Sequence, residues 1–393
     1  MRLLFVHDHR FYRDESGAIL TSGSLPAAVW DRYLDQFETV HVVGRDGGLA
    51  PAGSNYTRSS HAGVTFDLIP GATYGQLILG SGGVRGRISD AVAQCDAAVV
   101  RLPSELGFLA AAECRRSGKP YAVEMVGCAW DAMRNHGSRL ARLYAPLFFS
   151  RTRRALRRAP LTLYVTTRWL QQRYPTDGKA YAASDVEIAP MDAEAQHARE
   201  ARLAHIAAGE PPVLGTVASL RIRSKGVQTA LAALGELRRD GLELRYRVLG
   251  GGDAAPWAAL AKRHGVADLV SFDGVRPAGH GVAGWLDSID IHLQPSFQEG
   301  LPRATVEAMS RGCACIGSTC GGIPELIPPD RLHRPGDVAG LAERIRSLAT
   351  DAAALAAASR RDGELSREFR PEPLAAIRSR FLSDLRDAAE RAR

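Results

Sequence analysis

Short apolar segments alternate with helical or looped stretches along most of this chain, and they do so in two series. The first series comprises residues 3–7, 40–43, 64–69, 97–102, 121–125 and 161–165. The second comprises residues 213–218, 246–249, 269–272, 289–293 and 314–317, separated by helical patterns such as 227–237 and 257–264. Strands that alternate with helices form a parallel sheet covered on both faces. The pattern therefore predicts an α/β fold with two doubly wound, Rossmann-like sheets.

A polar, alanine-rich segment from Met191 to Pro212 separates the two series. It ends in Gly209-Glu210-Pro211-Pro212, and a Pro-Pro pair before a new strand is a natural domain start. At 393 residues, 45% of them hydrophobic, the chain is long enough for two separate cores. We therefore expect domains at 1–190 and 191–368, followed by a charged amphipathic helix within 369–393.

The chain carries no sign of a membrane span or an export signal. No apolar run approaches the roughly eighteen residues of a spanning helix. Met1 to His7 are too few and too soon polar for a signal peptide, and they resemble a first buried strand. The six cysteines form neither a disulfide framework nor metal-ligand pairs, so we interpret them as core residues. We expect a cytoplasmic protein.

Two glutamates stand eight residues apart in PSFQEGLPRATVEAMSRG, residues 295–312. Glu299 falls in a turn, and Glu307 lies about two turns into the helix that Pro302 can begin, because proline at a first helical position gives up only an unpaired amide. Such a helix start offers N–H donors to a phosphate, and carboxylates accept hydrogen bonds from sugar hydroxyls. The stretch predicts a sugar-phosphate site; the alternative is two solvent-facing glutamates at a helix end.

The residues after this helix add a buried-strand pattern, Cys313 to Gly317, and a second glycine turn, Gly321 to Leu326. With these elements, residues 295–327 resemble the donor-binding signature of the retaining glycosyltransferases of family four, which have the GT-B architecture. The resemblance covers nearly the whole chain and is most specific in residues 215–327. It implies two Rossmann-like domains facing a cleft, the first for the acceptor and the second for a nucleotide-sugar donor, with the terminal helix returning to the first domain.

The resemblance also implies roles for single residues of the donor site. Glu299 would contact the donor sugar and Glu307 the nucleotide ribose, beside the turn Gly300-Leu301-Pro302. The nucleotide base would lie near Val275. The configuration at the sugar carbon would be retained, by a front-face route in which a donor phosphate oxygen helps to take the acceptor's proton. No Asp-x-Asp or similar ligand spacing stands out, so we expect no metal ion and no other cofactor.

A basic loop, Arg221 to Gly226, follows the first strand of the second domain. We predict that Lys225, as a point charge, and one arginine, as a fork across two oxygens, hold a diphosphate. Family members typically place an arginine and a lysine in this loop. The register leaves Arg221 and Arg223 open, with Arg221 preferred; a solvated basic loop is the alternative.

Two glycine loops are further candidates for the donor site. Gly250 begins a glycine triplet directly after the strand at 246–249, and ligands of doubly wound sheets bind at the carboxyl ends of strands. A simple turn explains such a triplet equally well. In the first domain, Gly23 lies in loop 16–25, which resembles the family's flexible glycine loop under the diphosphate.

The first domain departs from the family pattern near the end of its fourth strand. Members commonly carry a histidine there that faces the donor sugar, whereas this chain has Arg101-Leu102-Pro103. Arg101 is a candidate for a phosphate on the acceptor or an ordinary strand-end arginine, and Glu124, which ends the next strand, is a candidate for acceptor hydroxyls. We interpret His7 and His9 as packing or turn residues.

Residues 134–158 hold eight arginines and no acid, a local charge of +8 against +7 for the whole chain. Apolar residues recur at helical spacing within this segment, and Pro146 must start or kink the helix. They are Leu140, Leu143, Tyr144, Leu147 and Phe148. One interpretation is a core-facing stripe with a solvated basic back. The other is docking on an anionic membrane, where each cation contributes about 1 kcal/mol.

The expected partners follow from these features. Residues 121–175, including Asn135-His136-Gly137, also resemble bacterial capsule and O-antigen transferases. We expect transfer of a sugar from a nucleotide-diphosphate sugar to a saccharide acceptor, linked to polyprenyl diphosphate at the inner face of the cell membrane, in cell-surface polysaccharide synthesis. We expect no nucleic-acid partner, because stacking platforms and binding motifs are missing. Two alternatives stay open: a nucleotide-sugar epimerase of the same fold, and a non-catalytic nucleotide-sugar-binding subunit.

Overall fold

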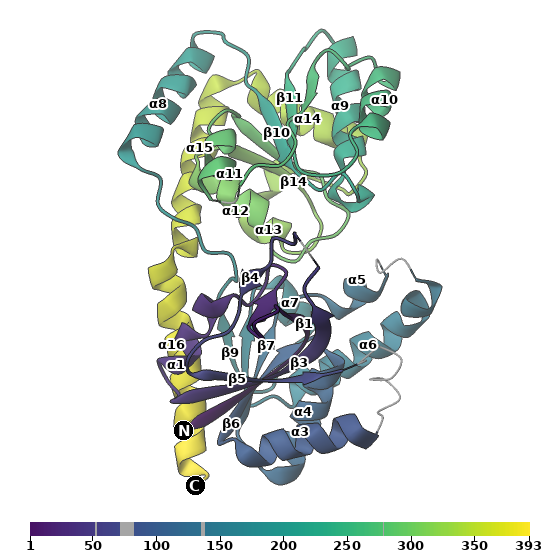
Figure 1. Cartoon of the computed structure of the whole chain (residues 1–393). Helices are drawn as coiled ribbons and strands as arrows, with labels where there is room; N and C mark the ends of the chain where they lie inside the picture. The colour runs from purple at the N-terminus through teal and green to yellow at the C-terminus, as the bar shows by residue number, and fades with distance from the viewer. Residues whose placement is uncertain (52, 71–81, 135–137, 278) are drawn as a thin grey trace. The chain divides into compact units, whose positions relative to one another are not determined.

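The computed structural model describes residues 1–51, 53–70, 82–134, 138–277 and 279–393 (Figure 1). They form two compact units: unit 1 is Met1–Asp185 with Ala375–Arg393, and unit 2 is Val186–Leu374. These limits differ by a few residues from the predicted 190 and 368. The reason is that Val186, Ile188 and Phe369 are buried in one core cluster of unit 2, which extends the unit at both ends. Asn135-His136-Gly137 lies outside the described residues.

Unit 1 contains a nine-stranded sheet. Its strands are β1 (Arg2–Arg13), β2 (Ile19–Thr21), β3 (Thr39–Leu49), β4 (Thr57–Arg58), β5 (Val64–Ile69), β6 (Ala97–Leu102), β7 (Tyr121–Met125), β8 (Leu161–Tyr164) and β9 (Lys179–Ala182). Parallel pairing gives the order β5-β3-β1-β6-β7-β8-β9, and β2 pairs antiparallel with the end of β1 and with β4. The order reverses between β1 and β6. A doubly wound sheet leaves a crevice at such a reversal.

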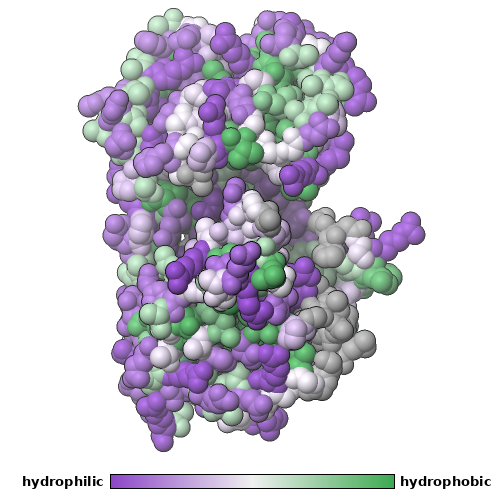
Figure 2. All heavy atoms as spheres, viewed as in Figure 1, coloured by the Kyte–Doolittle hydropathy of each residue, from purple (hydrophilic) through white to green (hydrophobic). Residues whose placement is uncertain are grey.

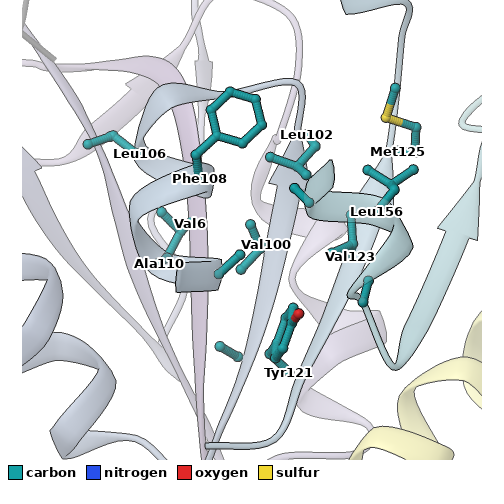
Figure 3. Packing of buried hydrophobic residues seen from close by; sticks show 14 of the residues in the cluster. Val6, Val100, Leu102, Leu106, Phe108, Ala110, Tyr121, Val123, Met125 and Leu156 are labelled. Carbon is teal, nitrogen blue, oxygen red and sulfur yellow. The ribbon is translucent and has the colours of Figure 1, made fainter. Parts of the chain in front are cut away.

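Helices cover this sheet and bury its apolar residues. In unit 1 they are η1 (Ala27–Val29), α1 (Asp31–Leu34), α3 (Gly82–Gln94), α4 (Glu105–Ser117), α5 (Ala129–Arg134), α6 (Arg139–Arg157), α7 (Trp169–Arg173) and most of α16 (Pro371–Arg391). Figure 3 shows strand residues Val100 and Val123 in one cluster with Phe108 of α4 and Leu156 of α6. β6 and β7 are buried along their whole length, and their residues other than Arg101 and Glu124 are apolar, as expected for strands covered on both faces.

The terminal helix α16 belongs mainly to unit 1. Phe381 of α16 packs edge-on against the ring of Tyr181 in β9, with ring centroids 5.5 Å apart. Asp384 of α16 pairs with Lys179 and accepts a hydrogen bond from Tyr181. Among the described residues, no helix is both long enough and apolar enough to cross a lipid bilayer.

Unit 2 contains a six-stranded sheet with the order β12-β11-β10-β13-β14-β15. The strands are β10 (Leu214–Val217), β11 (Tyr246–Leu249), β12 (Val270–Phe272), β13 (Ile291–Gln294), β14 (Ala314–Ser318) and β15 (Leu332–His333), and all pairs are parallel. The order reverses between β10 and β13. The loops after these two strands, which carry Lys225 and Glu299, therefore share one edge of the sheet.

Unit 2 is covered by helices on both faces, and a separate core cluster lies on each face. The helices are α8 (Ala193–Ala207), η2 (Arg223–Lys225), α9 (Val227–Arg239), α10 (Ala255–Arg263), α11 (His280–Leu286), α12 (Arg303–Ser310), α13 (Ile323–Leu326), η3 (Pro329–Arg331), α14 (Val338–Ala349), α15 (Ala352–Ser366) and η4 (Arg367–Phe369). The predicted doubly wound arrangement of the second half is thus present.

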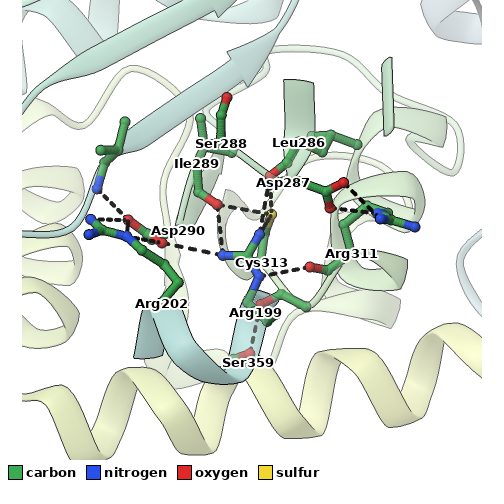
Figure 4. Close-up of polar contacts among 12 residues, drawn as sticks. Arg199, Arg202, Leu286, Asp287, Ser288, Ile289, Asp290, Arg311, Cys313 and Ser359 are labelled. Atoms are coloured by element: carbon green, nitrogen blue, oxygen red, sulfur yellow. Dashed lines mark hydrogen bonds and ion pairs between the residues drawn. The ribbon is translucent and has the colours of Figure 1, made fainter. Parts of the chain in front are cut away.

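A buried ion pair fixes the start of β13. Arg199 of α8 is 7% exposed and contacts Asp290 at 3.3 Å (Figure 4). It also donates to the carbonyl oxygens of Leu286, Ile289 and Arg311. The other carboxylate oxygen of Asp290 accepts from the backbone of Val213 at 2.8 Å. Because Val213 precedes β10 and Asp290 precedes β13, this cluster holds the two central strands together at the end opposite to Glu299.

Candidate functional site

The Glu299 carboxylate is the centre of a polar cluster in unit 2. Its Oε1 atom accepts hydrogen bonds from Lys225 Nζ at 2.7 Å, Gln294 Nε2 at 2.7 Å and Ser296 Oγ at 2.8 Å. The Glu299 side chain is 8% exposed, whereas that of Lys225 is 30% exposed. Among the described residues, Oε2 of Glu299 receives no hydrogen bond. The cluster thus offers a solvent-accessible cation and a free carboxylate oxygen side by side.

Two helices start beside this cluster without a side-chain cap. Gly226 is the N-cap of α9 and Pro302 that of α12, and no side-chain hydrogen bond caps either one. Pro302 lies one residue earlier than we predicted, because α12 begins at Arg303 and proline takes the extended N-cap conformation. First-turn amides without an internal partner suit an anion. Together with Lys225, these helix starts can bind a diphosphate.

Glycines allow the loops of this site to pack backbone against backbone. Gly226 has φ +79°, and a Cβ at this position would overlap the carbonyl oxygen of Pro295. Gly321 has φ +59°, and a Cβ there would overlap the carbonyl oxygen of Glu299. The next residue, Gly322, donates to the carbonyl oxygen of Gly300 at 2.7 Å. The second predicted glycine turn therefore supports the Glu299 loop directly.

Glu307 lies on α12 and is half-buried. Burial raises the pKa of its carboxyl group, and the charge of Arg303 acts in the opposite direction. Among the described residues, its side chain has no hydrogen-bond partner. A desolvated carboxylate without a partner gains from hydroxyl donors of a ligand. Leu301, in the turn before α12, is half-buried.

The basic loop distinguishes its two arginines. The guanidinium of Arg223 lies 5.7 Å from the ring centroid of Trp257, in a cation–π contact. Arg221 is exposed, and among the described residues its guanidinium has no hydrogen bond or ion pair. Arg221 is therefore the arginine that remains available to a phosphate.

Gly250 and Val275 occupy neighbouring loops at the same edge of the sheet. Gly250 has φ +157°, and a Cβ there would overlap the carbonyl oxygen of Ala218. Its amide donates to the carbonyl oxygen of Gly274 at 2.8 Å. Val275 follows and is 74% exposed. Close backbone packing accounts for Gly250 without a ligand, and the donor-binding roles of Gly250 and Val275 stay predictions.

The corresponding reversal in unit 1 is filled by a residue that the sequence analysis did not select, Asp8. Its carboxylate accepts from the amides of Glu105 at 2.7 Å and Leu106 at 2.9 Å and from Ser104 Oγ at 3.0 Å. Asp8 is 8% exposed, and burial raises the pKa of its carboxyl group while the Leu106 and Glu105 amides and the Ser104 hydroxyl oppose that rise. The start of α4 is therefore satisfied by the protein itself.

Arg101 and Glu124 face each other on neighbouring strands, β6 and β7. They are 7% and 4% exposed, and Arg101 Nε lies 3.7 Å from Glu124 Oε2. Arg101 also pairs with Asp185, and Glu124 accepts from the hydroxyl of Tyr33 at 2.7 Å. The structure thus brings both predicted acceptor residues together in a buried ionic network. Their role toward an acceptor stays a prediction.

The remaining first-domain candidates lie near the end of β1. Gly23 is exposed with φ +129°, in the loop after β2. His9 contacts Thr21 Oγ1 at 2.7 Å and packs edge-on against Phe11. Burial, and then the charge of Arg101, lower the pKa of His9 to about 4. His9 is thus engaged in local packing, as we interpreted it.

Sequence reasoning missed His292, Gln294 and Ser296, which lie under Glu299. Only His292 falls within the segment 289–293 that we predicted as a strand, and the alternation of polar residues with Ile291 and Leu293 did not indicate the partners of these side chains. All three are at most 1% exposed.

Comparisons with known proteins show which family this chain resembles. A family described as glycosyl transferases group 1 matches residues 211–351. Protein CapJ of Staphylococcus aureus is 28% identical over 349 residues, covering 88% of this chain and 85% of CapJ. The 2-deoxystreptamine glucosyltransferase of Streptomyces kanamyceticus is 30% identical over 266 residues, covering 65% of this chain and 68% of that enzyme. A putative colanic acid biosynthesis glycosyltransferase, WcaL of Escherichia coli (strain K12), is 34% identical over 137 residues, 32% of this chain and 33% of WcaL.

Solved structures share the fold. HepE of Anabaena, in complex with UDP, aligns with a TM-score of 0.66 at 16% identity, covering 98% of this chain and 100% of HepE. HepE has also been solved with UDP-glucose, and that structure aligns with a TM-score of 0.62 at 16% identity, covering 98% of this chain and 100% of HepE. The structural neighbours are GT-B glycosyltransferases, in agreement with the predicted fold. By its family match and its relatives, this chain belongs to the glycosyl transferases of group 1.

Proposed function

We propose that this chain transfers a sugar from a nucleotide-diphosphate sugar to a saccharide acceptor in the synthesis of a cell-surface polysaccharide. The observation that carries the proposal is the Lys225–Glu299 pair, which lies beside two uncapped helix starts where the sheet of unit 2 reverses its order. The likeness to HepE, solved with UDP and with UDP-glucose, supports a nucleotide-sugar donor. The likeness to a putative colanic acid biosynthesis glycosyltransferase supports a polysaccharide product.

In the proposed mechanism, Lys225 and Arg221 hold the diphosphate, Glu299 accepts from hydroxyls of the donor sugar, and Glu307 accepts from the ribose. Negative charge develops on the departing phosphate oxygen as its bond to the sugar carbon breaks, and Lys225 with the amides of α9 and α12 stabilises that charge. The acceptor oxygen forms the new bond on the same face, so the configuration is retained. The acceptor's proton passes to a phosphate oxygen of the leaving nucleoside diphosphate.

We propose that transfer needs no metal ion. The negative charge of the diphosphate needs no divalent cation, because Lys225, Arg221 and the two helix starts neutralise it. Among the described residues, no group of three His, Cys, Asp or Glu side chains is arranged to hold a metal. A chelator should therefore leave the transfer rate unchanged.

We propose that the acceptor is lipid-linked and that unit 1 reaches it through α6, at the cytoplasmic face of the cell membrane. Helix α6 buries Ala145, Phe148, Thr152, Ala155 and Leu156. Leu140, Leu143 and Leu147 are 78%, 78% and 55% exposed, so the predicted stripe divides between the core and the solvent. Pro146 lies inside α6 and does not start it, contrary to one of our two expectations. Hydrophobic and hydrophilic side chains lie side by side where α6 begins (Figure 2).

The charge of α6 is also divided. Arg151 pairs with Glu105 at 2.9 Å, and this ion pair lowers the local excess of positive charge below the +8 of the sequence. Arg153, Arg154, Arg157 and Arg158 line one open pocket together with Asp177. An apolar stripe followed by arginines suits an anionic lipid surface. Cosedimentation with vesicles should increase with the fraction of anionic lipid, and Leu143→Gln should reduce it.

The donor is tested by thermal melting against UDP, GDP, TDP and their sugars in the presence of chelator. A ligand at 100 times its dissociation constant stabilises by about 2.7 kcal/mol, which is a clear shift. Transfer is then measured by mass spectrometry with a saccharide acceptor. Glu299→Gln should lose most turnover and keep its fold. Conversion of the nucleotide sugar without an acceptor would indicate an epimerase, and full biological activity of Glu299→Gln would indicate a non-catalytic subunit.

A further inference from the structure

Polar and apolar side chains alternate along β13 below Glu299. Ile291 and Leu293 lie in the core cluster on one face of the sheet. His292 and Gln294 are 0% and 1% exposed, and Gln294 Oε1 contacts α12 on the other face. Apolar side chains would fill a buried strand without the cost of desolvating polar groups. The polar residues of β13 therefore call for a reason other than packing.

The side-chain amide of Gln294 has an acceptor, Oε1, and a donor, Nε2, and both atoms form hydrogen bonds. Nε2 donates to Glu299 Oε1 at 2.7 Å and to Ser296 Oγ at 2.8 Å. Oε1 receives Thr305 Oγ1 at 3.2 Å and His292 Nε2 at 3.1 Å. A reversed amide would place its oxygen against the Glu299 carboxylate, which can only accept. In the orientation present, the Thr305 hydroxyl and His292 Nε2–H donate to Oε1, so both residues stabilise the amide orientation that serves Glu299.

His292 is in the form that this arrangement requires. Its Nε2 must carry the proton, because Gln294 Oε1 is only an acceptor. Nδ1 is buried without a partner among the described residues, so the ring has no acceptor for a second proton. Burial lowers the pKa of His292 to about 4, against the bond to Gln294 and together with the charge of Lys225. The ring is therefore neutral near pH 7 and acts as a fixed N–H donor.

We propose that His292 and Thr305 are positioning residues of the donor site, which act through Gln294 to hold the Glu299 carboxylate with Oε1 on Lys225 and Oε2 free for the donor sugar. The proposal rests on the proposed function, since it assigns no reaction of its own. His292, Gln294 and Thr305 are all buried, so water does not replace a lost hydrogen-bond donor at Gln294. Loss of either donor then lets the amide turn, and the carboxylate loses its fixed rotamer.

The test compares the affinity for a nucleotide sugar with the affinity for its nucleoside diphosphate. Dissociation constants are measured for the nucleotide sugar that the wild-type protein binds in the melting panel and for its parent nucleoside diphosphate. His292→Leu should weaken binding of the nucleotide sugar about tenfold, which corresponds to about 1.4 kcal/mol, and change binding of the diphosphate less than about twofold. Thr305→Val, which keeps the side-chain shape, should give the same selectivity at about threefold. His292→Gln, which keeps an N–H donor, should restore most of the affinity.

A matched control is His333→Leu, because His333 is also buried in unit 2, at 4% exposure, and its ring donates from Nδ1 to the carbonyl oxygen of Arg334 at 2.8 Å. It should leave the ratio of the two dissociation constants unchanged. Equal weakening of both ligands by His292→Leu and Thr305→Val, or no rescue by His292→Gln, would overturn the positioning role. If His292→Leu does not fold, Thr305→Val and His292→Gln decide. A wild-type protein that binds no nucleotide sugar would overturn the proposed function itself, and this assignment with it.

Discussion

The two units have the same order of strands at their centres, but they differ at the crevice where that order reverses. In unit 1, Asp8 and Ser104 occupy the start of α4, so its first amides are satisfied. In unit 2, α9 and α12 start without a side-chain cap, and Lys225 is 30% exposed beside them. The same strand order thus gives two crevices, and in unit 1 the Asp8 carboxylate already accepts from first-turn amides of the kind that suit an anion.

The largest effect is expected from removing the positive charge of Lys225 in unit 2. Lys225→Met should lower the transfer rate about 100-fold or more, because the leaving diphosphate loses its nearest positive charge. The measurement is kcat with saturating donor. Lys262→Met is the matched control, since Lys262 is exposed on α10 away from the cluster. A loss below about threefold in Lys225→Met would remove the distinction between the two crevices.

The glycines of unit 2 should affect stability nearly as strongly. Gly226→Ala and Gly321→Ala should each cost about 2–4 kcal/mol, because a left-handed backbone and an overlap with a carbonyl oxygen add together. Gly300→Ala should stay within about 0.5 kcal/mol, because nothing lies within 4 Å of its Cβ position. Denaturant unfolding measures all three. Equal effects at Gly300 and Gly321 would show that the loops do not pack as described.

In unit 1, Asp8→Ala should cost about 2–3 kcal/mol in the free energy of unfolding, because two buried amides and a hydroxyl lose their acceptor. Asp8→Asn keeps an acceptor and should cost less. Neither change should alter the dissociation constant of the nucleoside diphosphate. Weaker diphosphate binding in Asp8→Asn, with an unchanged fold, would give the crevice of unit 1 a part in donor binding.

The two arginines of the basic loop in unit 2 should differ in their effect on diphosphate binding. Arg221→Ala should weaken binding of the nucleoside diphosphate about tenfold, as expected for one charge-assisted contact. Arg223→Ala should have about a threefold effect or less, because its guanidinium lies over Trp257. Isothermal titration distinguishes them, and the reverse ranking would assign the phosphate contact to Arg223.

The prediction that distinguishes the two units least is a dependence of stability on pH, because each unit contributes one buried histidine. The folded-state pKa values of His9 in unit 1 and His292 in unit 2 are both lowered from 6.5 to about 4. Between these values the unfolded chain binds more protons, so stability should fall as the pH falls from about 6.5 towards about 4, by at most about 1.4 kcal/mol per pH unit for each ring. His9→Gln and His292→Gln should each flatten the slope. An unchanged slope in both variants would contradict this.

Much of the fold was predictable because buried parallel strands are mostly apolar. The segments at 97–102 and 121–125 match β6 and β7, and that at 246–249 matches β11. The strands missed were β2, β4, β9 and β15, which have only two to four residues each. Their existence depends on pairing at the edge of a sheet, as β2 pairs with the far end of β1, and such pairing leaves little local pattern.

The candidate site was predictable where one residue type carries the chemistry by itself. Glu299, Lys225 and the glycine turns were found from the sequence, and the structure joins them through hydrogen bonds and backbone packing. Gln294 and Asp8 were missed, because a glutamine in a strand or an aspartate after one has no meaning until its partners are known. The burial of Arg101 against Glu124 likewise follows from the register of β6 and β7.

The sequence by itself determined the alternation of strands and helices, the family signature of residues 295–327 and the concentration of arginines in residues 134–158, because these depend on local order along the chain. The tertiary structure alone decided that Asp8 binds the start of α4 in unit 1. It also decided that Lys225 and Gln294 both donate to Glu299 in unit 2. Those facts depend on which strands become neighbours. Neighbours are chosen by the burial of whole faces and not by the residues that later meet at their ends.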